Sequence, residues 1–153
     1  MKTPEQQTIE VLNSLIEACR DGQEGFKTAA QHAKAGELSQ LFLTYSGERG
    51  KYVRELQNRV TAIGGKSESS GTVSGSLHRG WMNLKSAIAS DDPQAVLVEC
   101  ERGEEAAANA YRAALRTSLD PETLEIVTRQ ARRVQITHSQ VKQLLEGVAY
   151  SRP

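Results

Sequence analysis

The stretch "GGKSESSGTVSG", residues 64–75, is a polar connection that divides the chain into two halves. Clusters of glycine and serine mark loops, because glycine and short polar side chains favour turns over regular helix. Elsewhere the chain is rich in alanine, leucine, glutamate, glutamine and arginine, and only 5% of its residues are aromatic. Such a composition favours helix over sheet. How the two halves are joined across this connection therefore decides the fold.

Two long helices are predicted before the connection. Apolar or small residues recur every three or four positions between Pro4 and Ala33, and again between Leu38 and Ile63. This spacing places them on one face of each helix. Gly36 lies between the two helices, and a turn this short makes neighbouring helices antiparallel.

A short helix and two further long helices are predicted after the connection. The stretch "SLHRGWMNLKSAIAS", residues 76–90, predicts a short helix that lies across the others, with Trp81 as an anchor. The long helices begin at Pro93 and Pro121, each directly after an aspartate, just as the first helix of the chain begins at Pro4 directly after Thr3, which is also a favoured N-cap residue. Aspartate is a favoured N-cap, and proline at the first helical position lacks only an N–H that would be unpaired anyway. The apolar face of the last helix is predicted to contain Leu124, Val127, Ala131, Val134, Val141 and Leu145.

We therefore predict an all-α fold in a single domain, residues 1–153. Two antiparallel helical hairpins are joined by a long crossover, about residues 64–91, which carries the short fifth helix. A crossover of this length allows the third long helix to run parallel to the second, which is the connectivity of a ferritin-like four-helix bundle. The length of 153 residues suits one continuous core.

Charge and hydropathy argue against several classes of partner. The chain has 19 basic and 19 acidic side chains, and so no net charge to attract nucleic acid or an anionic membrane. No apolar run approaches the roughly 20 residues of a membrane span, and the N-terminal residues contain no signal-peptide core. Cys19 and Cys100 occupy apolar helix positions, as the buried, reduced cysteines of a cytosolic protein do. We expect a cytoplasmic protein that binds neither membrane nor nucleic acid.

The apolar face of each long helix is interrupted once by a polar residue: Gln23, Glu48, Glu104 and His138. A carboxylate or imidazole in a helical core costs several kcal/mol unless it is paired, hydrogen-bonded or bound to a metal. Counting back from the turns places Glu24 opposite Glu48, Glu104 opposite Arg133, and His138 opposite residues 99–101. Gly47 and Gly50 flank Glu48, and we expect them to allow close approach of a neighbouring helix.

One interpretation of these polar residues is a carboxylate-bridged metal site. Carboxylate oxygens together with an imidazole suit iron or manganese, and a Glu-x-x-His motif puts both ligands on one helix face. The candidate ligands are Glu24, Glu48, Glu104 and His138, with Glu101 as a substitute. The motif is incomplete, because Lys51 replaces the histidine expected after Glu48, and Gln135 replaces the glutamate expected before His138.

The other interpretation, which we favour, is that neighbouring side chains neutralise the acids. Arg49, Arg133 or Lys51 can form ion pairs with them, and buried polar pairs of this kind can fix helix register. The protein is then a non-catalytic structural or interaction protein without a cofactor. The alternative is an iron- or manganese-binding di-metal protein, either a di-iron-type oxidoreductase or a storage protein. Because alanine-rich helices this long often bury surface against a second copy, we also expect a homodimer or higher homo-oligomer.

The stretches "LNSLIEACRDGQEGF" (residues 12–26), "LHRGWMNLKSAI" (77–88) and "ECERGEEAA" (99–107), with Tyr111 and His138, resemble the ferritin-like superfamily. More closely, the chain resembles a bacterial family of uncharacterised ferritin-like four-helix-bundle proteins, a domain of unknown function. The wider resemblance implies an iron-binding oxidase, reductase or storage protein with a stress-related role. On matching positions it implies ligand roles for Glu24, Glu48, Glu104 and His138.

Overall fold

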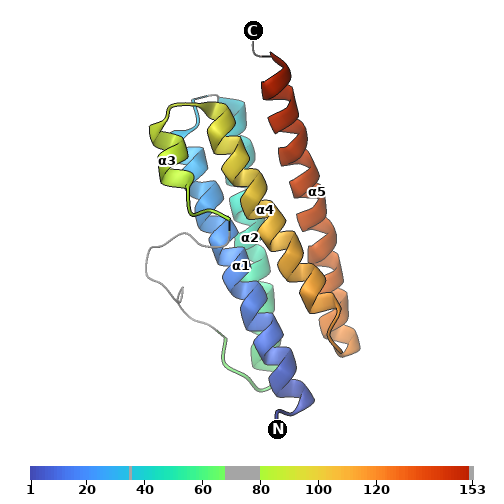
Figure 1. Ribbon diagram of the computed structural model, residues 1–153. Helices are drawn as coiled ribbons and strands as arrows, with labels where there is room; N and C mark the ends of the chain where they lie inside the picture. The colour runs from blue at the N-terminus through green and yellow to red at the C-terminus, as the bar shows by residue number, and fades with distance from the viewer. Residues whose placement is uncertain (35, 68–79, 152–153) are drawn as a thin grey trace.

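A computed structural model describes residues 1–34, 36–67 and 80–151 of the protein. Within these residues it contains no strand and five helices: α1 (Pro4–His32), α2 (Gly36–Ala62), α3 (Leu84–Ala89), α4 (Pro93–Leu115) and α5 (Pro121–Ser151). The four long helices lie lengthwise beside one another (Figure 1). No helix in this part of the chain combines the length and the apolarity that a membrane span requires. The five helices, with no strand among the described residues, confirm the predicted all-α class.

The predicted capping residues begin three of the long helices. Thr3 accepts a hydrogen bond from the backbone N–H of Gln6, whose side chain accepts one from the backbone N–H of Thr3, which makes a capping box. Asp92 and Asp120 each accept a hydrogen bond from a backbone N–H in the first turn of α4 and α5. Proline occupies the first position of all three helices, as predicted.

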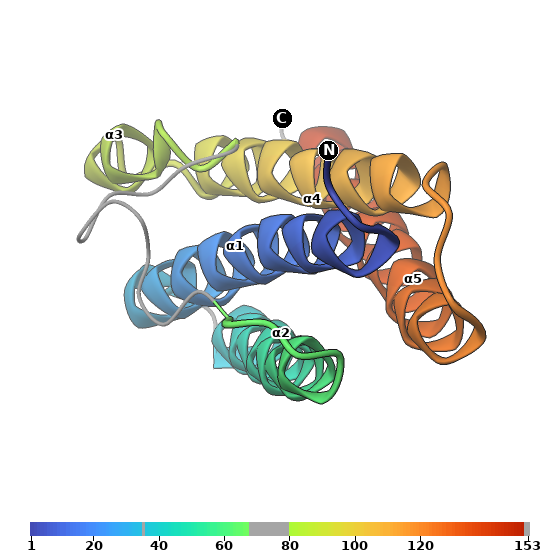
Figure 2. The ribbon, with the colours of Figure 1, turned by 90° about the horizontal axis from the view of Figure 1, so that it is seen from below.

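The long helices pack as two hairpins, α1 with α2 and α4 with α5. Helix α1 packs along both α2 and α4, whereas α2 and α5 touch at few points and diverge in the view from below (Figure 2). One apolar cluster fills the end of the molecule near the N-terminus and includes Leu12, Leu56 and Tyr111. A second cluster, around Phe26 and Trp81, fills the other end. All four long helices contribute to both clusters, and α1, which packs along both α2 and α4, forms the centre of the core.

The segment between α2 and α3 starts at one end of the molecule and finishes near the other. Gly64, with a φ of +89°, follows the end of α2, and the side chain of Asn13 in α1 donates a hydrogen bond to the carbonyl of Lys66 at 3.2 Å. Helix α3 lies against α4 at the opposite end (Figure 1). Residues 68–79 of the predicted crossover lie outside the described residues.

The helix predicted over residues 76–90 is helical only from Leu84 to Ala89 in the described part of the chain. Gly80 has a φ of +95°, a conformation that L side chains rarely adopt and that does not continue into a helix. A Cβ on Gly80 would lie 2.5 Å from the carbonyl oxygen of Arg102, so the backbone rests directly on α4. Trp81 follows and is fully buried, with 1% of its surface exposed. The anchor role of Trp81 is confirmed, but Trp81 lies before the helix.

Helix α5 buries Val127, Val134 and Val141 as predicted, but it is rotated so that the most exposed of the predicted residues is Leu124. Leu124 is 43% exposed, whereas its neighbour Thr123 is fully buried. The buried residues of the helix are Thr123, Val127, Gln130, Val134, Thr137 and Val141. The rotation has a polar cause, because Thr123 accepts a hydrogen bond from Arg59 and Gln130 bonds to Tyr111 and Glu55. These contacts put polar residues where the apolar pattern alone predicted leucine and alanine.

Candidate functional site

A buried ion pair lies at the centre of the molecule, between α2 and α4. The Nη2 atom of Arg49 is 2.5 Å from the Oε2 atom of Glu104, and the side chains are 2% and 0% exposed. Burial alone would lower the pKa of Arg49, but the adjacent carboxylate of Glu104 raises it above its ordinary value. The guanidinium of Arg49 is therefore charged, and the carboxylate of Glu104 is its counter-ion. Each charge is tolerated in the interior only because the other compensates it.

Helix α1 forms the wall that encloses Arg49. A Cβ on Gly22 would lie 2.8 Å from the Nη1 atom of Arg49, so the glycine makes room for the guanidinium. The guanidinium carbon lies 5.8 Å from the ring centroid of Phe26, within the range of a cation–π interaction. Three helices thus shape this site, and an apolar ring closes one side of it.

A chain of hydrogen bonds leads from the interior toward the α2–α5 side. The hydroxyl of Tyr111 donates to Oε1 of Gln130 at 2.7 Å, and Nε2 of Gln130 donates to Oε1 of Glu55 at 2.8 Å. The Sγ atom of Cys19 lies 3.0 Å from the Tyr111 hydroxyl. Since the single hydroxyl proton is directed to Gln130, the thiol of Cys19 is the donor in that contact. Burial, with the neighbouring Cys19, raises the pKa of Tyr111 well above its ordinary value, so the hydroxyl stays protonated.

Ion pairs bridge α2 and α5, which share few backbone contacts. Arg59 of α2 contacts Glu122 of α5 and its N-cap, Asp120. Farther along, Glu55 pairs with Arg129 and Glu48 pairs with Arg133. Although burial by itself raises the pKa of Glu55, hydrogen bonds from Arg129 and Gln130 bring it below its ordinary value. The α2–α5 interface is therefore held largely by charge, whereas the α1–α4 interface is apolar.

Both cysteines are free and buried, as predicted. Burial and the neighbouring carboxylates of Glu104 and Glu99 raise the pKa of the Cys100 thiol well above its ordinary value. Thiol reactivity depends on the thiolate form, so Cys100 is an inert core residue.

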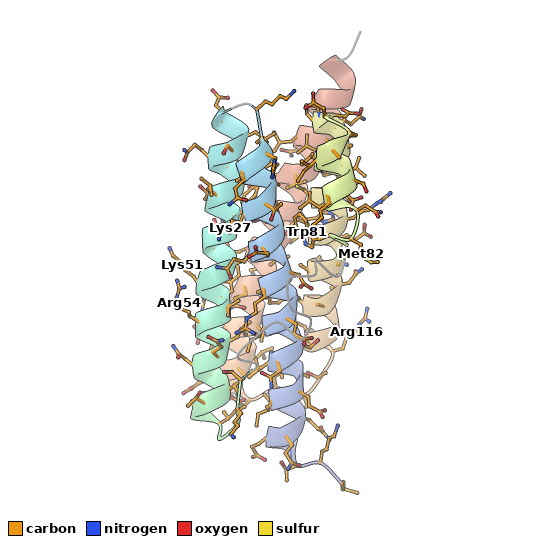
Figure 3. All side chains as sticks on the ribbon, turned by 90° about the vertical axis from the view of Figure 1, so that its left-hand side faces the viewer. Lys27, Lys51, Arg54, Trp81, Met82 and Arg116 are labelled. Atoms are coloured by element: carbon orange, nitrogen blue, oxygen red, sulfur yellow. The ribbon has the colours of Figure 1, made fainter. Side chains whose placement is uncertain are left out.

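Three of the candidate ligands that the sequence suggested, Glu24, Glu48 and Glu104, do not belong to one potential metal-binding group. Glu104 pairs with Arg49 rather than with Arg133, and Glu48 pairs with Arg133 at 3.1 Å. Glu24 is exposed on α1. Lys51 is exposed and projects outward from α2 (Figure 3). Ion pairing of Glu104 and Glu48 with arginine agrees with the interpretation that neighbouring side chains neutralise the acids.

His138 contacts Glu101, which belongs to the range 99–101 that was predicted to lie opposite it. Its Nε2 atom lies 3.0 Å from Oε1 of Glu101, across the α4–α5 interface. Glu101, Glu105 and His138 form one group whose potential ligand atoms all lie within 4.8 Å of one another. Among the described residues, no other group of three or more histidine, cysteine, aspartate or glutamate side chains meets this criterion. Glu24, Glu48 and Glu104 do not belong to it.

These positions do not fit the pair of iron or manganese ions that a ferritin-like fold implies. Oε1 of Glu104 is buried without a hydrogen-bond partner among the described residues, but Oε2 of the same carboxylate is held by Arg49. The guanidinium is permanently charged, and a metal ion bound at the remaining oxygen would lie within a few ångströms of it in a medium of low dielectric. The carboxylate of Glu104 therefore belongs to the ion pair and does not suit a di-metal centre.

Sequence reasoning missed Glu55 and Gln130, which link the interior to the α2–α5 ion pairs. Glu55 lies one position before the buried Leu56 of α2 and gave no sign of its role. Gln130 lies seven positions after Thr123 and seven before Thr137, a heptad of polar residues that could have revealed a buried polar face.

Comparison with known proteins gives one family. A search of curated proteins found no match. The family model described as "Domain of unknown function (DUF2383)" matches residues 7–117. The match covers α1 to α4 and ends before α5, so it includes Arg49 and Glu104 but not His138. The chain therefore belongs to the DUF2383 family.

Proposed function

We propose that this chain is a ferritin-like four-helix bundle with a structural or protein-interaction role, working in a bacterial cytoplasm. The connectivity is supported by α2 and α4, which run in the same direction in Figure 1. The single observation on which the proposed structural role rests is the buried Arg49–Glu104 ion pair. Two free, buried thiols agree with a reducing compartment.

The ion pair argues against catalysis because it occupies the carboxylate that a metal centre would need. The resemblance to the ferritin-like superfamily implies that Glu104 is a metal ligand. In this structure, however, Glu104 compensates the charge of Arg49. An arginine cannot lose its proton to make way for a metal ion. The carboxylate therefore has a structural task, which is to hold α2 and α4 in register around α1.

We expect metal analysis to show far less than one iron or manganese ion per chain, even in protein expressed with both metals added. The Glu104→Gln variant should have the same iron and manganese content and a lower melting temperature, because it weakens the ion pair without changing its shape. Plasma mass spectrometry and thermal unfolding measure the two quantities. About two iron or manganese ions per chain, lost in Glu104→Gln, would instead identify a di-metal oxidase or storage protein.

The interaction role includes self-association, and the outer side of α4 and α5 is the surface that supports it. Leu124 and Ile136 of α5 are each 43% exposed, and Leu115 of α4 is 37% exposed. A groove of about 300 Å³ between the two helices is lined by Leu115, Ala131 and neighbouring residues. Burial of Leu115, Leu124 and Ile136 against another protein would remove apolar surface from water.

We expect light scattering to give at least twice the 16.7 kDa mass of one chain at micromolar concentration. The double variant Leu124→Glu/Ile136→Glu should shift the protein to a monomer, because charge would have to be buried in the contact. Leu43→Glu is the matched control, since Leu43 is 46% exposed but lies on α2. A monomeric wild-type protein would remove self-association from the proposal.

A further inference from the structure

Two acidic side chains between α4 and α5, Glu101 and Glu105, have no arginine or lysine partner among the described residues. Six acidic residues of the described chain have an arginine partner: Glu48, Glu55, Glu99, Glu104, Asp120 and Glu122. Among the described residues, the only ion-pair partner of Glu101 is His138, and Glu105 has none. The group therefore holds two carboxylates close together without a permanently charged partner among the described residues.

The side chains of Glu101, Glu105 and His138 lie close together. Glu101 and Glu105 are four residues apart on α4 and so lie on the same helix face. His138 reaches this face from α5, and its ring is only 14% exposed, with Nε2 directed at the carboxylate of Glu101. Glu101 is 21% exposed, whereas Glu105 is exposed and free to rotate. The site thus has two partly buried groups and one adjustable group at its open side.

We infer that Glu101, Glu105 and His138 form a surface site for a single Zn²⁺ ion. Zinc accepts histidine nitrogen and carboxylate oxygen at roughly 2.0–2.2 Å, which places tetrahedral ligand atoms roughly 3.4 Å apart. Nε2 of His138 and Oε1 of Glu101 are already 3.0 Å apart, and the three potential ligand atoms lie within 4.8 Å of one another. A small rotation of the Glu105 side chain closes the remaining distance.

The chemistry of the ligands selects the ion. One imidazole and two carboxylates suit zinc, and at nitrogen- and oxygen-containing sites zinc binds more tightly than manganese or ferrous iron. Three protein ligands leave the fourth zinc position to water. This site lies on the outer α4–α5 interface and does not involve Glu104, so it is independent of the buried ion pair. Because its ligands come from two helices, zinc would link α4 to α5.

The test is a zinc titration of chelator-treated full-length protein by isothermal calorimetry near neutral pH. We expect one saturable site per chain and a melting temperature that rises with zinc concentration, because zinc binds the folded state. His138→Ala and Glu105→Gln should each weaken binding by more than about tenfold, since each removes a ligand. Glu105 is exposed, so its variant keeps the fold intact, which circular dichroism verifies.

The matched controls are His32→Ala, which removes a histidine at the end of α1, and Glu104→Gln. Both should bind zinc as the wild type does. Absence of saturable binding, or wild-type affinity in His138→Ala and Glu105→Gln, would overturn the zinc site and leave the proposed structural role intact. Loss of zinc in Glu104→Gln would place the ion at the buried centre and would overturn both.

Discussion

Replacement of Arg49 by methionine is expected to lower the free energy of unfolding by about 3–5 kcal/mol. The variant leaves the carboxylate of Glu104 fully buried and without its compensating charge. Methionine fills much of the space of the arginine stem, so the loss measures the uncompensated charge more than a cavity. Urea unfolding monitored by circular dichroism at neutral pH gives the value.

A double variant separates the charge effect from the loss of packing. Arg49→Met combined with Glu104→Leu removes both charges, and we expect it to recover most of the stability lost by Arg49→Met alone. The matched control is Arg133→Met, because Arg133 pairs with Glu48 but is 45% exposed, and its loss should cost less than about 1 kcal/mol. If Arg49→Met and Arg133→Met had equal effects, the buried pair would have no special role in holding the helices.

Replacement of Trp81 by alanine should lower the free energy of unfolding by a similar amount, about 3–5 kcal/mol. The indole is 1% exposed and packs edge-on against Phe26, with ring centroids 4.9 Å apart. Its removal leaves a large cavity between α1 and α4. Denaturant unfolding measures the loss, and a variant that unfolds at the wild-type urea concentration would show that Trp81 does not anchor the segment before α3.

The glycines that face Trp81 provide a sharper test of the same contact. A Cβ on Gly103 would lie 2.1 Å from Cε2 of Trp81, so Gly103→Ala should destabilise the protein by about 1–3 kcal/mol. In the Trp81→Ala background the clash disappears, and the same substitution should become neutral or stabilising. Gly47→Ala is the control, because no atom lies within 4 Å of the added Cβ, and it should stabilise by about 0.8–1 kcal/mol.

The sequence predicted the local features of this fold well. Helix starts depend on capping residues within one turn, so Thr3, Asp92 and Asp120 identified them directly. The position of His138 opposite Glu101 was also predicted from the sequence, within the range 99–101. A short turn between two regular helices fixes which of their residues lie opposite each other, so counting from the turn is enough. Gly50 approaches Gln23 of α1 closely, as expected of a glycine at a helix contact.

Features that depend on three helices at once could not be predicted in this way. Arg49 was predicted as an ion-pair partner of the acids, but its burial was not predicted, because it depends on Gly22 of α1, which makes room for the side chain. Gly47, by contrast, faces open space, so the expectation of close approach was wrong there. The rotation of α5 depends on hydrogen bonds that its residues form with Arg59, Tyr111 and Glu55, which belong to other helices. An apolar pattern in one helix carries no information about such partners.

The central position of α1 has a consequence for synthesis of the chain. A ribosome releases α1 first, and α2 can pair with it at once because the two are adjacent in sequence. The partners of α1 in α4 arrive much later; Cys19 and Tyr111, for instance, are 92 positions apart. Contacts across such a separation close a long loop and form slowly. The first hairpin therefore waits with an uncovered apolar face during translation, and α1 is enclosed only after α4 has been synthesised.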